Sequence, residues 1–406
     1  MTALARYRRI LSRPGAALFS ATGLVARLPI SMVGLGIVLL VESSTGSYGV
    51  AGAVSAAYMV ANAVLAIVQG RLLDAVGQAR VLATATLVFG AAMVLLITSV
   101  EADWPIGATY LAAALAGGSL PQIGSCVRAR WSWVLDQPSD KQTAYALEAV
   151  ADEAVFILGP ILVTLLATTV DPVAGLAVAI VAGVGGSLFF ASQHATEPPA
   201  RRHDRSTGAR PPLPWRTIAP LAVVSAAMGV LFGAAEVTTV AFSEAQGNEA
   251  YAGGLLALWA LGSLVAGFVT GAVTWRSGPV VRVRWGAFAM ACAMAPLFLV
   301  DSVWVMGAVL LAGGVAIAPT LVATMSLTEQ SVPSARLTEG MAIMQTGLVA
   351  GVAPGATVSG FVVDHSGASA AYLVCLVAGL VAALAAQAIP SGAARADRPR
   401  EPSDAG

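Results

Sequence analysis

The sequence contains twelve stretches of mostly apolar residues, each about as long as the roughly 20 residues that a helix needs to cross a lipid bilayer. Only 11% of the residues are charged, whereas soluble domains carry about a quarter, so a soluble protein is excluded. The stretches do not alternate between apolar and polar residues as barrel strands do. We therefore predict an all-α integral membrane protein with twelve transmembrane helices, near residues 15–41, 50–71, 80–99, 105–127, 143–167, 173–192, 216–242, 251–275, 283–300, 303–327, 338–363 and 368–389.

The basic residues predict how the chain is oriented. Arginines precede the first predicted span, and basic residues recur in every second connection, whereas the other connections contain Asp and Glu without Lys or Arg. By the positive-inside rule, both termini are then cytoplasmic. The chain contains a single lysine, Lys141, and much alanine, which indicates a GC-rich bacterial genome. We expect a multi-pass protein of the bacterial plasma (inner) membrane.

A polar segment divides the chain into two similar halves. Residues 193–215 are rich in Pro and Arg and predict a cytoplasmic linker between a six-helix bundle in 1–192 and a second in 216–390, followed by a disordered cytoplasmic tail in 391–406. A shift of 201 residues superimposes four pairs in corresponding spans: Gly52 on Gly253, Tyr58 on Trp259, Gly70 on Gly271 and Gly77 on Gly278. Two similar halves are typical of secondary transporters, and we predict two pseudo-symmetric bundles.

The connection between the second and third spans carries a recognisable motif. It reads Gly70-Arg-Leu-Leu-Asp74-Ala-Val-Gly77-Gln-Ala-Arg80. With the twelve spans and the repeat, this motif makes the whole chain resemble the major facilitator superfamily. The sequence departs from the family signature at Ala75, Gln78 and Ala79, where basic residues are usual, and leaves Arg80 as the nearby cation.

The resemblance implies that Asp74 belongs to a charge cluster that holds the cytoplasmic side closed. A carboxylate at this position can stabilise the N-terminus of a neighbouring helix and pair with an arginine. We expect Arg128, at the inner end of the fourth span, to be that arginine. The alternative is that the motif only forms a tight turn that packs two helices.

Five charged residues fall inside predicted spans and away from the span ends, where each charge costs about 2.5–3.5 kcal/mol on the mildest scale. They are Arg27 in the first span, Glu148, Asp152 and Glu153 in the fifth, and Glu236 in the seventh. Arg27 lies at a similar depth to the fifth-span acids, so we expect it to pair with one of them while another holds a proton. This cluster is either a structural ion pair or a proton or substrate-charge site. Glu236 has no cation at its depth. It therefore either binds a proton as a coupling site or lines a water-filled outer vestibule.

The resemblance also implies a substrate cavity at the midplane between the halves. Polar or aromatic residues away from the span ends are the candidates for lining it, although each also suits simple packing: Tyr58, Asn62, Gln122, Trp259, Thr324 and Gln345. Few charges and several apolar groups favour an uncharged, weakly cationic or amphipathic organic substrate. Alternatively, Arg27 binds a carboxylate.

The motifs required for other functions are missing from the sequence. It has no nucleophile elbow, zinc-protease motif or phosphate loop, and Cys126, Cys292 and Cys375 lack metal-site spacing. The 22 basic and 22 acidic residues cancel, which gives no indication of a nucleic-acid partner. We expect a monomeric transporter without metal or cofactor, exporting a small organic molecule in exchange for protons. The alternative is uptake of a small metabolite such as a sugar, amino acid or organic acid, by symport or facilitated diffusion.

Overall fold

The computed structural model describes residues 3–200, 211–248, 251–273 and 275–393, and over these residues the chain is helical without strands. Residues 201–210 of the predicted linker and 394–406 of the predicted tail lie outside the described residues.

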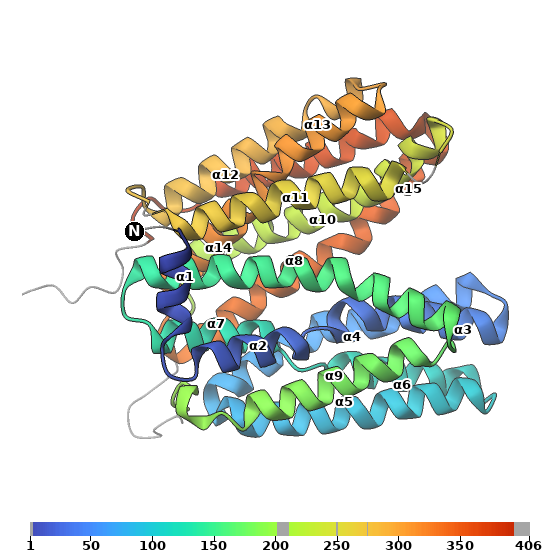
Figure 1. Ribbon diagram of the computed structural model, residues 1–406, viewed down its shortest axis with the longest axis horizontal. Coiled ribbons are helices and arrows are strands. Elements are labelled where there is room, and N and C mark those ends of the chain that lie inside the picture. The colour runs from blue at the N-terminus through green and yellow to red at the C-terminus, as the bar shows by residue number, and fades with distance from the viewer. Residues whose placement is uncertain (1–2, 201–210, 249–250, 274, 394–406) are drawn as a thin grey trace, which may run out of the picture.

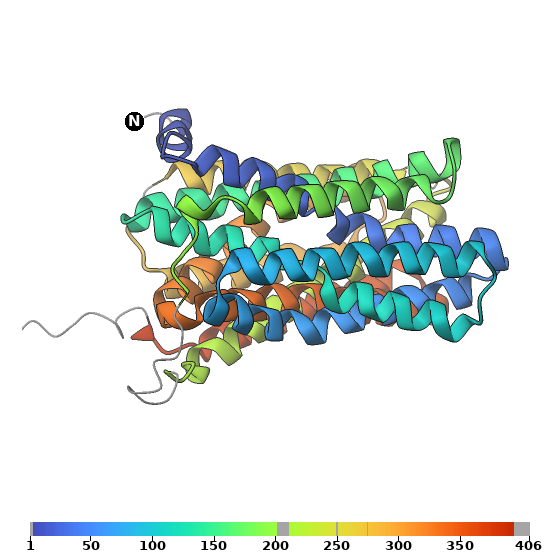
Figure 2. The same cartoon turned by 90° about the horizontal axis from the view of Figure 1, so that it is seen from below.

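The chain before the predicted linker forms helices that run side by side along the long axis of the molecule (Figures 1 and 2). We call α2 to α9 the N-terminal half; α1 lies across one end. The helices are α1 (Ala3–Leu11), α2 (Ala16–Ala26), α3 (Pro29–Thr45), α4 (Tyr48–Val76), α5 (Gln78–Glu101), α6 (Ile106–Ser119), α7 (Ile123–Val134), α8 (Pro138–Thr169) and α9 (Ala174–Ala191), followed by the short η1 (His194–Thr196).

The chain after the predicted linker forms a second group of helices, which we call the C-terminal half. Its members are α10 (Trp215–Ala245), α11 (Tyr251–Ala272), α12 (Pro279–Met294), η2 (Leu297–Leu299), α13 (Val303–Gly314), α14 (Ile317–Ser331), η3 (Ser334–Arg336) and α15 (Leu337–Gln387). The halves meet where α4, α7 and α8 pack against α11, α14 and α15.

Ten helical segments among the described residues are long and apolar enough to cross a membrane. The predicted span 105–127 is not among them, because α6 ends and α7 begins around Pro121. The break leaves backbone carbonyl groups without helical partners. Gln69 on α4 donates to two of them, those of Gly118 and Leu120, both at 3.0 Å. The last two predicted spans run together in α15, which is interrupted at Gly367 by non-helical dihedral angles (φ 83°, ψ 168°). These two features account for the difference from the predicted twelve.

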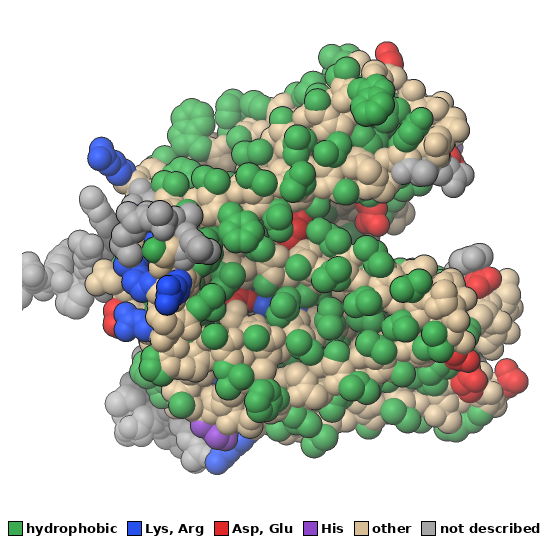
Figure 3. Space-filling model, in the orientation of Figure 1, with side chains coloured by type: hydrophobic (Ala, Val, Ile, Leu, Met, Phe, Trp, Pro, Cys, Tyr) green, Lys and Arg blue, Asp and Glu red, His purple; other side chains and the backbone are tan. Residues whose placement is uncertain are grey.

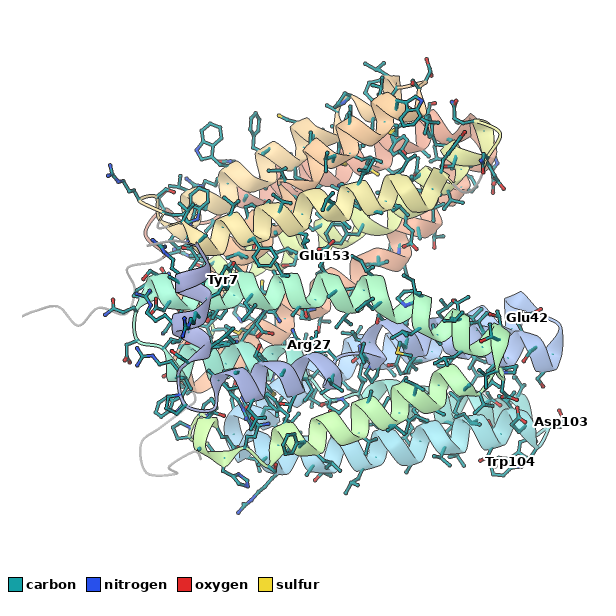
Figure 4. All side chains as sticks on the ribbon, viewed as in Figure 1. Tyr7, Arg27, Glu42, Asp103, Trp104 and Glu153 are labelled. Atoms are coloured by element: carbon teal, nitrogen blue, oxygen red, sulfur yellow. The ribbon has the colours of Figure 1, made fainter. Side chains whose placement is uncertain are left out.

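The surface shows a hollow between the two halves (Figure 3). It opens at the end of the molecule where acidic side chains gather and narrows toward the end where basic side chains gather. We call these the acidic end and the basic end. Glu42, Asp103 and Trp104 lie at the acidic end (Figure 4).

Glycines bring the helices within each half into close contact. A Cβ atom on Gly117 of α6 would lie 1.9 Å from the Tyr58 carbonyl oxygen, and one on Gly314 of α13 would lie 2.1 Å from the Trp259 carbonyl oxygen. Tyr58 and Trp259 are a pair in the 201-residue repeat, so the two halves use the same helix contact at equivalent positions.

The same kind of packing joins α10 to α15. A Cβ atom on Gly351 would lie 2.2 Å from the Ala226 carbonyl oxygen, and one on Gly355 would lie 2.0 Å from that of Val230. Small residues spaced four apart allow such backbone contact in membrane helices.

We predict that Gly351→Ala destabilises the C-terminal half, because its methyl group overlaps backbone atoms that cannot move independently. Overpacking of this kind costs about 1–3 kcal/mol, so the melting temperature of the detergent-purified protein should fall by several degrees. Gly360→Ala on the same helix is the matched control, since a Cβ atom there has no neighbour within 4 Å. Equal melting temperatures for the two variants would contradict the packing.

Candidate functional site

Arg27 lies at a break in the first membrane segment, between α2 and α3. Its side chain points toward α8 and is buried, with 5% of the residue exposed. The guanidinium Nε donates to the Gly23 carbonyl oxygen at 3.0 Å, which leaves the two terminal nitrogens for other partners. The break therefore places a cation inside the N-terminal half.

Two carboxylates of α8 bind this cation. Arg27 Nη2 lies 2.5 Å from Glu148 Oε2, and Nη1 lies 2.6 Å from Asp152 Oδ1. A second arginine, Arg128 of α7, binds the other oxygen of Asp152 at 2.5 Å. The four side chains form a charge-compensated network, which we call the arginine–carboxylate network.

This geometry corrects two expectations. Arg27 pairs with two acids of the fifth predicted span, whereas one was expected. The prediction that Arg128 pairs with Asp74 is wrong for this conformation, because the Arg128 guanidinium bonds to Asp152 and to the Gly124 carbonyl oxygen. The register of α7 after the break at Pro121 places Arg128 beside α8.

Glu148 is fully buried and has further donors. Ser20 Oγ and Trp131 Nε1 each donate to Glu148 Oε1 at 2.8 Å. Sequence reasoning missed both residues, because a serine in an apolar span and a tryptophan near a span end carry no signal of a carboxylate partner. Glu148 is thus held by side chains from α2 and its C-terminal end and from α7, which suits a structural role.

Glu153 lies on a different side of α8. Its Oε2 accepts a hydrogen bond of 3.2 Å from Ser263 of α11, in the C-terminal half. Figure 4 shows Glu153 between α8 and α11, with Arg27 on the opposite side of α8. Glu236 is exposed on α10, and none of the ion pairs between described residues includes Glu153 or Glu236.

A small pocket of about 30 Å³ adjoins the network. Arg27, Asp152, Gln122 and Phe156 line it from the N-terminal half, and Gln345 of α15 lines it from the C-terminal half. The pocket therefore brings two of the six predicted cavity residues, Gln122 and Gln345, together with the intramembrane charges.

The other predicted cavity residues are buried. Asn62 accepts a 3.0 Å hydrogen bond from Gln122 at the edge of this pocket. Tyr58 and Trp259 lie in the hydrophobic cores of their own halves. Thr324 donates to the Thr320 carbonyl oxygen of its own helix at 2.9 Å. Packing accounts for the positions of these last three, and their contact with a substrate stays a prediction.

Asp74 sits at the basic end and receives two backbone hydrogen bonds from the other half. Its carboxylate accepts from the Thr338 amide at 3.1 Å and from the Glu339 amide at 2.9 Å. These amides belong to the first turn of α15, where free N–H groups and the helix dipole favour an anion. The predicted interaction with a neighbouring helix N-terminus is present.

Glu339 is the centre of this contact and was missed by sequence reasoning. Its buried carboxylate pairs with Arg71 of α4 and with Arg336 of η3, both at 2.7 Å. Gly70 makes the approach possible, because a Cβ atom there would lie 3.0 Å from Glu339 Cα. The i, i+3 spacing of Arg336 and Glu339 at the start of a predicted span was the available signal.

The rest of the motif shapes the turn between α4 and α5. Gly77 has φ 104°, in the left-handed region that favours glycine. The Ala79 amide donates to Glu197 Oε1 at 2.9 Å, and Gln78 accepts from Arg130 Nε at 2.9 Å. Arg80 is exposed and belongs to none of the ion pairs between described residues.

Further polar contacts join the halves at the basic end. Lys141 of α8 pairs with Glu329 of α14 at 2.7 Å, and the Thr143 hydroxyl donates to the Gly271 carbonyl oxygen at 2.6 Å. Tyr7 of α1 donates to the Phe268 carbonyl oxygen at 3.2 Å. The molecule is thus closed by polar contacts at one end and hollow at the other (Figure 3). Among the described residues, no group of His, Cys, Asp and Glu is placed to hold a metal.

Solved structures with the same fold include several membrane transporters. The human organic anion transporter MFSD10 (TETRAN) has a TM-score of 0.72 at 17% identity, covering 94% of this chain and 99% of that one. A bacterial homologue of the iron transporter ferroportin in the outward-facing state has a TM-score of 0.73 at 14% identity, covering 92% and 98%. The proton:xylose symporter XylE has a TM-score of 0.67 at 12% identity, covering 91% and 94%. No curated protein matches the sequence.

The sequence itself matches the Major Facilitator Superfamily over residues 19–316, which is most of the chain. The matched region includes the motif around Asp74, the arginine–carboxylate network and the inter-half contacts of α8 and α11. The chain therefore belongs to the major facilitator superfamily and is a multi-pass membrane transporter of small molecules.

Proposed function

We propose that the protein exports a small organic molecule in exchange for protons by alternating access. The observation that carries this proposal is the hollow that is closed at the basic end by breakable polar contacts and reaches toward buried intramembrane charges. An alternating-access transporter needs a central site, a closure at one end and a second closure that replaces it.

The membrane orientation follows from the charges at the two ends. By the positive-inside rule, the basic end faces the cytoplasm, so the hollow opens outward. The breaks at Pro121 and Gly367 support twelve crossings, because each lies where the predicted spans meet or bend. We place the protein as a monomer in a bacterial plasma membrane, with both termini cytoplasmic and with 1–192 and 216–390 as the two moving bundles.

The contacts of Asp74 and Glu339 form the proposed cytoplasmic gate. Both link α4 to the start of α15, so opening the hollow toward the basic end requires them to separate. Ion pairs and helix-terminus hydrogen bonds suit a gate, because water can satisfy the same groups once they part. The backbone contacts at the glycines inside each half have no such alternative, so each half moves as a unit.

The proposed substrate site is the pocket lined by Arg27, Gln122, Asp152, Phe156 and Gln345. It is the place where side chains of both halves meet beside the arginine–carboxylate network, which compensates its own charges. Two further acids, Glu153 and Glu236, form no ion pair with the arginines of this network. A neutral network beside two acids without arginine partners favours an uncharged or weakly cationic amphipathic substrate.

Glu153 is the proposed coupling residue for protons. A carboxylate at membrane depth is costly without a cation, and a bound proton removes that cost. Its hydrogen bond to Ser263 crosses the interface between the halves, so movement of the halves changes its surroundings. A residue whose surroundings alternate during the cycle can bind a proton on one side and release it on the other.

We predict that Asp74→Asn reduces transport at least about tenfold, as expected when a charge-assisted pair of hydrogen bonds is lost. The amide nitrogen would face one of the two α15 amides, and the favourable charge at the helix N-terminus disappears. The measurement is growth of a bacterial host that lacks its own exporters, on a panel of toxic organic compounds and of single carbon sources. Asp364→Asn, an exposed acid at the other end, is the matched control.

Tolerance to a compound that depends on the native protein and is lost in Asp74→Asn supports export and identifies a substrate class. Near-normal tolerance with Asp74→Asn at equal membrane abundance would contradict the gate. Better growth on a carbon source, without protection from any compound, would replace export by uptake and make Arg27 a candidate ligand for a carboxylate substrate.

We also predict that Glu153→Gln abolishes the pH dependence of transport while substrate binding persists. The measurement is substrate-induced proton movement in inverted membrane vesicles, followed with a pH-sensitive dye, alongside substrate binding to the purified protein. Glu236→Gln tests the competing acid. If pH dependence survives in Glu153→Gln, Asp152→Asn and Glu236→Gln alike, proton coupling through these residues is wrong.

A further inference from the structure

A second pocket lies on the surface of the C-terminal half, between α12 and the segment where α13 meets α14, with a volume of about 430 Å³. It is separate from the hollow, because α12 packs mainly against α13, α14 and α15 of its own half. Several of its lining side chains are exposed, including Trp275 and Trp285. In a membrane protein, a groove at this position faces lipid.

One face of α12 forms the length of the groove. The lining residues Arg282, Trp285, Gly286, Ala289 and Ala293 follow a helical repeat of three and four residues. Eleven residues separate Arg282 from Ala293, a distance of about 16 Å along a helix. One leaflet of a hydrocarbon core is about 15 Å thick. The groove therefore has the length of one acyl chain.

The walls are made of small apolar side chains. Gly286, Ala289 and Ala293 of α12 lie opposite Ala312 of α13 and Ala316, which stands at the break between α13 and α14. Larger residues at these positions would fill the space. The groove is thus a narrow apolar slot, and an unbranched hydrocarbon chain fits this shape.

Arg282 stands at the basic end of the slot with unused donors. Its Nε and Nη1 atoms are buried and have no hydrogen-bond partner among the described residues. Arg284, two residues further on, contrasts with it, because its nitrogens donate to the Ala386 carbonyl oxygen at 3.3 Å and to that of Ile389 at 2.7 Å. Buried donors of a charged group are costly to leave unpaired, so Arg282 requires an acceptor that the described residues do not supply.

Two tryptophans beside Arg282 indicate how deep in the membrane this arginine lies. Trp275 and Trp285 both line the groove, are 42% and 67% exposed, and lie near Arg282 in the sequence. Tryptophan concentrates at the level of the lipid headgroups. The cation therefore sits at headgroup depth, with the apolar slot extending from it toward the membrane centre.

We propose that this groove binds a phospholipid with an anionic headgroup. The phosphate accepts hydrogen bonds from Arg282, and one acyl chain lies along the small-residue face of α12. Basic sites between membrane helices on the cytoplasmic side recognise anionic lipids by the same combination of charge and apolar surface. The site depends on the membrane location of the chain and is independent of the direction or coupling of transport.

The test is native mass spectrometry of the detergent-purified full chain titrated with phosphatidylglycerol or phosphatidylcholine of identical acyl chains. The native protein should retain one phosphatidylglycerol in preference to phosphatidylcholine. Arg282→Gln should weaken phosphatidylglycerol retention about tenfold, because a charge-assisted hydrogen bond to phosphate is lost. Arg276→Gln, an exposed arginine close to the groove, removes the same charge and should leave retention unchanged.

A second variant tests the slot without touching the charge. Ala289→Phe fills the groove from an exposed position and should reduce retention of both lipids, even if Arg282→Gln fails to fold. Excess inorganic phosphate should not displace the lipid. Displacement by phosphate alone, equal retention by the native protein and Arg282→Gln, or unchanged retention by Ala289→Phe would each overturn the proposal.

Discussion

The burial of Arg27 inside the membrane is the constraint on which the N-terminal half depends. A guanidinium there is tolerated only beside anions, and Glu148 and Asp152 supply them from successive turns of α8. Those two carboxylates would in turn repel each other without the cation. Arg128 binds the remaining oxygen of Asp152, so the network contains two positive and two negative charges. It joins α2, α7 and α8, and it fixes the face that α8 turns toward the other half.

Contacts inside each half and contacts between the halves differ in how easily they break. Inside each half, helices touch through backbone atoms at glycines such as Gly117, Gly314 and Gly351, and separating them would open apolar voids. At the basic end, the halves touch through Asp74, Glu339 and their partners, which water can replace. In a protein built in this way, we expect the halves to move relative to each other where their polar contacts separate. The same distinction explains why the family moves as two bodies around a central site.

The sequence predicted the features that follow from local pattern. Span positions, the repeat that pairs Tyr58 with Trp259, and a helix N-terminus as partner of Asp74 all rest on hydropathy, spacing or the dipole of a helix end. It could not predict the partner of Arg128, because the break at Pro121 resets the rotation of α7, and a one-residue change moves a side chain by about 100°. Glu339 was missed for a related reason: its importance arises from a contact with Arg71, which lies in the other half of the chain.

Asp152 and Glu153 show how one helix separates two tasks. Neighbouring residues of a helix point about 100° apart, so Asp152 turns into the arginine–carboxylate network while Glu153 turns toward Ser263 of the other half. A carboxylate held by two arginines serves the architecture. A carboxylate at a moving interface, with a single hydroxyl partner, can respond to both protonation and conformation. The arginines that hold Asp152 thus leave Glu153 outside their network, and this is why Glu153 is the acid proposed to couple protonation to the movement of the halves.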